Sequence, residues 1–353
     1  MGGKRKTHLD FLRILAAFLV LVHHSELMEL FDHMPAGLVG IFALSCMTSL
    51  VFINVPLFYM ISGALLLGRE ESDRVIYGKR IPRFLLLTFL ASSFTYIYRC
   101  YPSFNTADFF RGFFAGNMDE THWYLYSYLG LLMCVPFLRR AAQGMTHGEA
   151  IVLVCMRFLL YSLLPGLNYI SNYKGYPPVP VSSSFSVPFV SVDILFYPLM
   201  GYYLEEKLPW EKADWKWAAV SLVVIGGGTG VCAVMTCHEG LWTSYSGTYL
   251  RLFTYAAAMA TLVLTKYLFT RPHREGRCRQ RLETILKTAS SLMLGVYILE
   301  PVLRPAVKPL LIGWMGEGAS PALTAVWYCV FGLVTYAAIT WVLKKLPVLR
   351  KIL

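Results

Sequence analysis

The chain has 353 residues, of which 56% are hydrophobic and only 15% are charged, whereas about a quarter of the residues of a typical soluble domain carry a charge. Its mean hydropathy is +0.52. These values exclude an ordinary soluble protein and predict a polytopic membrane protein. Spans of about 20 residues with short connections leave no room for a separate soluble domain. We therefore expect residues 1–353 to form a single transmembrane domain.

The basic excess has a simple explanation in a membrane protein. The chain contains 32 Lys and Arg against 21 Asp and Glu, a formal charge of +11. Such an excess could indicate a nucleic-acid partner in a soluble protein, but here it is typical of the positive-inside rule, and we expect no nucleic acid. The eight cysteines form no CxxC and no Cys/His metal spacing. We therefore expect neither a disulfide framework nor a metal site.

Long apolar runs predict an all-α bundle of about ten transmembrane helices. The predicted spans are residues 9–30, 40–67, 83–99, 121–138, 149–166, 185–204, 216–236, 249–269, 284–303 and 320–343. Ten spans would leave both termini on the same side of the membrane.

The distribution of basic residues predicts the orientation of this bundle. With a cytoplasmic N-terminus, the cytoplasmic segments hold 24 Lys and Arg and the opposite segments hold 5. Both termini are therefore expected in the cytoplasm, with the connections near 100–120 and 167–184 outside. These two connections are rich in Tyr, Pro, Ser and Asn. They suit contact with a neutral hydroxylated substrate, or they belong to an interfacial aromatic belt.

The first span holds the most informative polar residues. Asp10 and Arg13 stand at i,i+3 and are close enough to pair. Arg13 and His24 are separated by about three turns plus ~20°, with a rise of ~16 Å, so they share one face at different depths. His23 is turned by ~100° from that face. Charged groups inside a span mark function by default, although an Arg snorkelling to the interface and a His at a helix end would give the same pattern.

Polar positions around the second and third spans form a second group. Residues 54–63 contain Pro56, which frees a backbone carbonyl, and a Ser62-Gly63 pair that permits close helix approach. Arg80 and Arg83 begin the third span and can face its cytosolic mouth, where planar donors suit phosphate. The alternative is that they only anchor the helix at the membrane surface.

The fourth and ninth spans add aromatic and acidic side chains. Trp123 and Tyr124 open the fourth span, at a depth where an aromatic belt is expected. Glu300 precedes a proline near the end of the ninth span. A buried carboxylate is costly unless it is paired, so we expect a partner such as His24 or Arg304.

Together, these motifs resemble the acyltransferase-3 family of membrane acyl-CoA-dependent acyltransferases, and the resemblance covers nearly the whole chain. Where many members have a histidine after the late Gly-x-Tyr stretch, this chain has Glu300. The matching positions, in chain order, are Asp10-Phe11-Leu12-Arg13 with His24, Pro56 to Gly63, Arg80 with Arg83, Trp123-Tyr124-Leu125, and Ser291 to Tyr297.

The resemblance implies transfer of an acetyl or other short acyl group from cytoplasmic acyl-CoA to a hydroxyl of a cell-surface glycan or related acceptor, at the plasma membrane. His24 would be the general base, because its unperturbed pKa lies close to working pH. Arg13, held by Asp10, would orient the donor or stabilise negative charge. Glu300 could orient His24 or bind the acceptor. Two arginines at the cytoplasmic end, Arg80 and Arg83, would bind acyl-CoA. The substrate would contact Ser62, Trp123 and Tyr124.

Two other functions fit the same composition. A transporter or flippase for a polar metabolite could use Asp10, Arg13, His24 and Glu300 as a coupling relay. A sensory membrane domain could bind an antibiotic or a cell-wall precursor without turnover. Consumption of acyl-CoA would favour the enzyme, whereas solute counterflow would favour the transporter.

Overall fold

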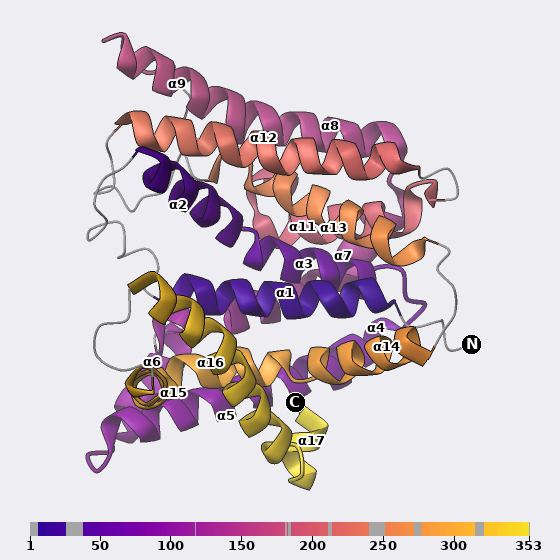
Figure 1. Ribbon diagram of the computed structural model, residues 1–353. Coiled ribbons are helices and arrows are strands. Elements are labelled where there is room, and N and C mark those ends of the chain that lie inside the picture. The colour runs from indigo at the N-terminus through magenta and orange to yellow at the C-terminus, as the bar shows by residue number, and fades with distance from the viewer. Residues whose placement is uncertain are drawn as a thin grey trace.

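The protein is described by a computed structural model that covers residues 6–25, 38–116, 118–180, 182, 185–210, 214–239, 251–271, 277–314 and 321–352. Most of these residues are helical, and none of them is in a β strand (Figure 1). The α-helices are α1 (Thr7–His24), α2 (Leu38–Val51), α3 (Asn54–Leu66), α4 (Asp73–Val75), α5 (Ile81–Cys100), α6 (Thr106–Ala115), α7 (Trp123–Gly144), α8 (His147–Phe158), α9 (Leu164–Tyr173), α10 (Pro188–Ser191), α11 (Asp193–Tyr202), α12 (Trp215–Glu239), α13 (Thr254–Thr270), α14 (Arg277–Ser290), α15 (Met293–Gly313), α16 (Pro321–Leu343) and α17 (Pro347–Ile352).

The all-helical membrane class is confirmed, but the count of ten spans is not. Six helical stretches in the described part of the chain are long and apolar enough to cross a membrane, or seven if α14 and α15, bent by 46°, form one span. The predicted spans 121–138, 185–204 and 249–269 coincide with α7, α11 and α13. None of these three helices is both long enough and apolar enough to count as a candidate membrane span. The six are Thr7–His24, Ser45–Leu66, Asp73–Cys100, His147–Tyr173, Trp215–Met235 and Leu323–Leu343.

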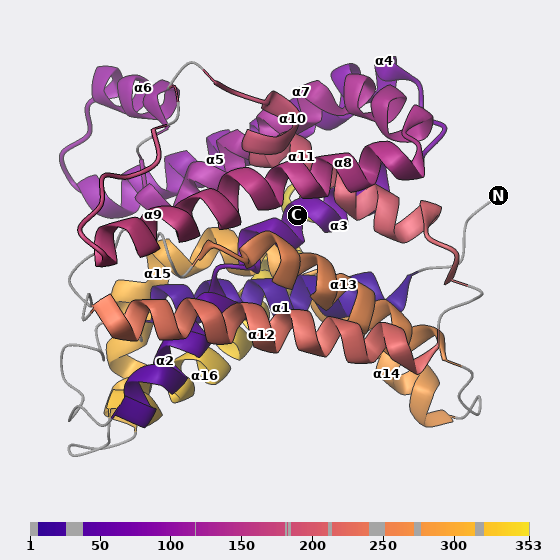
Figure 2. The same ribbon diagram turned by 90° about the horizontal axis from the view of Figure 1, so that it is seen from above.

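Helix α1 lies in the interior of the bundle and positions the polar residues of the first span. It packs against α3, α13, α14, α15 and α16 (Figure 2). Figure 1 shows α2, α3 and α13 on one side of α1, and α14, α15 and α16 on the other. Apolar side chains at helical spacing, Leu9, Leu12, Ala16 and Val20, are buried along it. A helix enclosed in this way can direct its few polar side chains into the interior of the bundle.

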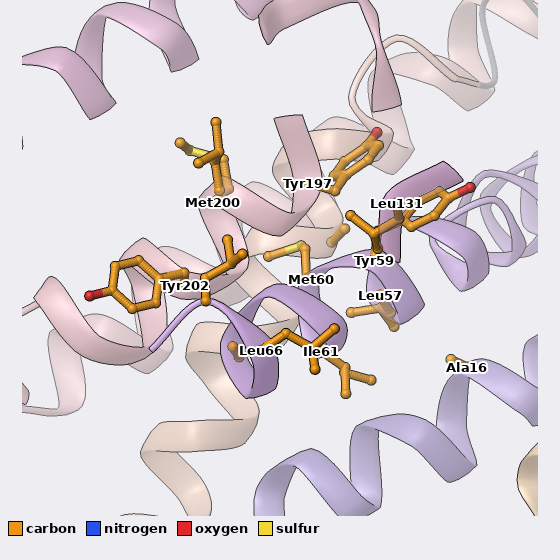
Figure 3. Packing of buried hydrophobic residues seen from close by; sticks show 14 of the residues in the cluster. Ala16, Leu57, Tyr59, Met60, Ile61, Leu66, Leu131, Tyr197, Met200 and Tyr202 are labelled. Atoms are coloured by element: carbon orange, nitrogen blue, oxygen red, sulfur yellow. The ribbon is translucent and has the colours of Figure 1, made fainter. Parts of the chain in front are cut away.

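Helices α3 and α11 approach each other closely at two glycines. A Cβ atom on Gly63 would lie 1.9 Å from the carbonyl oxygen of Pro198, and one on Gly201 would lie 2.1 Å from that of Met60. The close approach expected at Ser62-Gly63 is therefore confirmed, because only glycine fits at such a contact. Figure 3 shows the surrounding apolar core, which includes Leu57, Tyr59, Met60, Leu131, Tyr197 and Met200.

The structure adds a helix to one predicted connection and divides one predicted span. The connection 100–120 contains helix α6, whose first turn is capped by the Asn105 side chain and which ends at Gly116 with φ of 69°. The predicted span 284–303 is divided between α14 and α15. The amide of Leu292 donates to the carbonyl of Ala289, a tight turn that ends α14 before α15 begins. The segment between the predicted spans 249–269 and 284–303 is therefore partly the amphipathic helix α14.

Candidate active site

Arg13 contacts residues from two helices. Its Nη1 donates to the Ser290 hydroxyl at 2.7 Å, and the same nitrogen lies 3.5 Å from a carboxylate oxygen of Asp10. The i,i+3 pair predicted within the first span is thus present. The motif that resembles the family begins at Ser291, but the Ser291 hydroxyl does not bond to Arg13; it donates to the Thr288 carbonyl. Its neighbour Ser290, the last residue of α14, is the one that reaches Arg13.

A cavity of about 330 Å³, which we call the basic cavity, lies beside Arg13 between α1, α3, α5, α7 and α15. Sequence analysis missed Arg69, because an arginine just after a span looks like an ordinary membrane anchor. Apolar side chains of α3 and α15 cover part of the wall. The polar residues that line the basic cavity are Arg13, Ser62, Arg69, Arg80, Arg83, Tyr124, Tyr128 and Tyr297.

The arginines of the basic cavity have different partners. Arg80 donates to both carboxylate oxygens of Glu71, at 2.9 and 3.1 Å. Arg83 is exposed and donates to the carbonyl of Ile352 at 3.3 Å. Within the described ranges, neither Arg69 nor Arg83 forms an ion pair with a carboxylate. Guanidinium groups therefore outnumber their acidic partners here, and the basic cavity suits an anion with several charges.

A wider cavity of about 1260 Å³ adjoins the basic cavity and shares Arg13, Leu65 and Arg69 with it. Asp10 and Glu71 also line this wider space. We call it the entrance cavity. A large ligand can occupy the two adjoining cavities together.

A second site, which we call the histidine cavity, has a volume of about 380 Å³ and lies at the other end of α1. Sequence analysis separated His23 from His24 by helical rotation, yet both line this cavity, since its wall is wide enough to include adjacent residues. The polar residues around it include His23, His24, Asn54, Thr121, Trp123, Tyr124, Arg157, Asp193, Arg251 and Tyr297.

His24 and Glu300 form a close pair. The Nδ1 atom of His24 lies 2.7 Å from Oε2 of Glu300, whose side chain is 0% exposed. The Tyr328 hydroxyl donates to Oε1 of Glu300 at 2.8 Å, and Nε of Arg304 lies 3.8 Å from Oε1. Arg304 also donates to the His24 carbonyl at 3.0 Å. The Glu300 carboxylate is thus paired with both His24 and Arg304, the two partners expected from the sequence.

This geometry assigns different roles to the two ring nitrogens of His24. A carboxylate accepts hydrogen bonds, so Nδ1 carries the proton that is shared with Glu300. Nε2 is then left with a lone pair that can accept a proton. Tyr328 was not foreseen, because it lies in an apolar run of α16 that carries no charge.

His23 makes weaker polar contacts than His24. Its Nδ1 lies 3.5 Å from the amide nitrogen of Asn54, and its ring packs edge-on against Phe52 at 5.5 Å. Among the described residues, no carboxylate lies within ion-pair distance of His23. Of the two histidines, only His24 is oriented by an acidic group.

The basic cavity and the histidine cavity meet at two tyrosines. Tyr124 and Tyr297 line both cavities, and their ring centroids are 5.7 Å apart. The Tyr297 hydroxyl donates to the carbonyl of Thr121. Side chains at opposite ends of α1 therefore face two spaces that share one aromatic wall.

A known protein family matches nearly the whole chain. Residues 7–344 match the family described as an acyltransferase domain, the acyltransferase-3 family. The chain belongs to that family. No curated protein and no solved structure matched the chain in two further comparisons. Together with the six or seven candidate spans in the described part of the chain, the match indicates a multi-pass membrane protein with an acyltransferase domain.

Proposed function

We propose that this protein is a plasma-membrane O-acyltransferase that moves an acetyl or other short acyl group from cytoplasmic acyl-CoA to a hydroxyl of a cell-surface glycan or related acceptor. The observation that carries the proposal is the wall shared by the basic cavity and the histidine cavity, formed by Tyr124 and Tyr297. Each substrate then has its own cavity, and the two cavities adjoin where the reacting atoms must meet.

The basic cavity and the entrance cavity bind the donor. Arg13, Arg69, Arg80 and Arg83 provide planar cationic groups for the phosphates of CoA. The pantetheine arm extends along the apolar wall of α3 and α15, and brings the thioester to the two tyrosines. The phosphates do not change during the reaction, so these arginines contribute binding rather than chemistry.

The histidine cavity binds the acceptor and performs proton transfer. Nε2 of His24 takes the proton of the acceptor hydroxyl as its oxygen forms a bond to the thioester carbonyl carbon. The carbon–sulfur bond then breaks, the electron pair stays on the CoA sulfur, and the imidazolium returns its proton to that thiolate. The Glu300 carboxylate at 2.7 Å stabilises the imidazolium while it exists.

The distribution of basic residues supports the direction of transfer. Of the 32 Lys and Arg, 24 belong to segments that the ten predicted spans assign to the cytoplasm when the N-terminus is cytoplasmic. In this orientation the Arg13 end of α1 faces the cytoplasm, where acyl-CoA is made. The His24 end faces outward, toward surface glycans.

Purified protein in nanodiscs tests the proposal. With acetyl-CoA and a methyl glycoside as acceptor, we expect release of the free CoA thiol and formation of an acetylated glycoside, detected by mass spectrometry. Counterflow of a polar solute in proteoliposomes, without any acyl transfer, would instead establish a transporter.

A further inference from the structure

The two arginines of the histidine cavity are not equally neutralised. Arg157 is buried, and its Nη2 donates to Asp193 at 2.9 Å and to the Tyr197 hydroxyl at 3.4 Å. Its guanidinium also lies 4.1 Å from the centroid of the Tyr161 ring. The charge of Arg157 is therefore matched by one carboxylate and by aromatic faces.

Among the described residues, Arg251 has no carboxylate partner of this kind. Its guanidinium carbon lies 4.3 Å from the centroid of the Phe52 ring, and the side chain is exposed. Within the described part of the chain, no carboxylate lies within ion-pair distance of Arg251. Stacking on an aromatic ring holds the guanidinium in place while its N–H groups remain available.

The charged groups of the histidine cavity therefore leave an excess of positive charge. Among the described residues of its wall, Arg157 and Arg251 are cationic and only Asp193 is anionic. The exposed guanidinium of Arg251 keeps N–H groups available, and an anionic ligand would form a charge-assisted pair with them. A neutral acceptor would not form such a pair with Arg251.

Building on the function proposed above, we infer that the acceptor carries a negative charge close to the hydroxyl that receives the acyl group, and that Arg251 binds this charge. The group is a carboxylate or a phosphate, since the guanidinium fork pairs with either one. This refines the neutral hydroxylated substrate that the aromatic connections suggested. The class includes uronic-acid residues and phosphorylated sugars.

Three small acceptors that differ in charge test the inference. Methyl glucoside, methyl glucuronide and glucose 6-phosphate are compared in acetyl transfer by the purified protein, and their binding is measured separately by calorimetry. We expect KM for at least one charged acceptor to lie about tenfold or more below that for methyl glucoside, as for a charge-assisted hydrogen bond. A preference for the glucuronide or for the phosphate identifies the anionic group.

Variants assign the preference to one side chain. Arg251→Gln should raise KM for the charged acceptor and remove the preference over methyl glucoside, and Arg251→Lys should restore part of it. Arg111→Gln is the matched control, because Arg111 lies on α6, is 82% exposed and does not line the histidine cavity. A preference for charged acceptors that survives in Arg251→Gln would overturn the assignment.

The outcomes also separate this inference from the proposed function. Equal transfer to all three acceptors would overturn the inference, but it would still support the proposed acyltransferase function. Selective binding of the charged sugars without any consumption of acetyl-CoA would overturn the proposed function and leave the anion-binding role of Arg251 standing. If the protein shows no acetyl transfer and no selective binding, both the inference and the proposed function are overturned.

Discussion

The two ends of α1 hold charge in different ways. At the Arg13 end, the guanidinium groups of the basic cavity have few acidic partners, so a ligand can pair with them. At the His24 end, the fully buried Glu300 is fixed by His24, Tyr328 and Arg304. A ligand cannot displace that arrangement cheaply, because it would leave a buried carboxylate unpaired. The first end is therefore suited to binding, and the second to chemistry.

The strongest test of this contrast is removal of His24. A general base contributes about 10²–10⁴-fold, so His24→Ala should lower kcat by at least ~100-fold and leave KM for acyl-CoA nearly unchanged. His23→Ala is the control, because His23 lines the same cavity without a carboxylate partner. Steady-state kinetics and melting temperatures measure both variants. If His24→Ala keeps more than about a tenth of the wild-type kcat, His24 is not the base.

Replacement of Glu300 should give the next largest effect. Glu300→Gln preserves the shape of the side chain but removes the charge that stabilises the His24 imidazolium, so we expect kcat to fall roughly 10- to 100-fold. Tyr328→Phe removes one hydrogen bond to the same carboxylate and should cost less. Melting curves show whether either variant is misfolded. An unchanged kcat in a folded Glu300→Gln protein would restrict Glu300 to a structural role.

At the Arg13 end the effects should fall on KM. Arg83→Ala should raise KM for acyl-CoA by about tenfold, since a charged hydrogen bond to phosphate is lost. Arg80→Ala should have a smaller effect, because Glu71 already holds that guanidinium. Lysine at either position should recover part of the loss. Lys79→Ala is the control, because Lys79 is exposed and does not line the basic cavity.

Donor titrations of these variants decide where the phosphates bind. If both alanine variants are folded and keep the wild-type KM, the phosphates are not held by Arg80 and Arg83. Arg13 and Arg69, which also line the basic cavity, would then be the candidates.

A buried acidic group near the Arg13 end should affect stability instead of turnover. Glu205 lies 3.0 Å from Nε2 of His8 and 3.2 Å from Nζ of Lys266. Burial raises the pKa of Glu205, but the hydrogen bond and charge of His8, with the charges of Lys266 and Lys6, outweigh it and lower this pKa to about 2. The stabilisation is complete above the ordinary carboxyl pKa and is lost as pH falls toward about 2.

Melting temperatures against pH measure that contribution. Glu205→Gln should lower the melting temperature at pH 7 by several degrees, for a loss of about 3 kcal/mol, and should weaken the dependence on acid. Glu206→Gln is the control, because the side chain of Glu206 is 42% exposed. Equal melting temperatures for the two variants would contradict a stabilising role for Glu205.

The local part of this site could be predicted from the sequence. Helix geometry fixes neighbours at i,i+3, so the Asp10 and Arg13 pair follows from the positions of the residues. A carboxylate in an apolar run must find a partner, which led to His24 as a partner of Glu300.

The contacts between distant segments could not be predicted in this way. The hydroxyls of Ser290 and Tyr328 reach the site from helices far along the chain, and only the packing of α14 and α16 against α1 brings them there. Periodicity also cannot distinguish a full span from a shorter interior helix such as α13, since both are apolar. The count of ten spans is not confirmed for that reason.

In the proposed reaction, donor and acceptor enter from opposite sides of the membrane and meet at Tyr124 and Tyr297. Proteoliposomes test it most directly, with the orientation of the protein established by an impermeant thiol reagent on the exposed Cys278. Acetyl-CoA is supplied on the side where Cys278 is labelled, and the acceptor is supplied only on the other side. We expect acetylated acceptor to accumulate in the acceptor compartment. Transfer only when both substrates share one compartment would contradict the account.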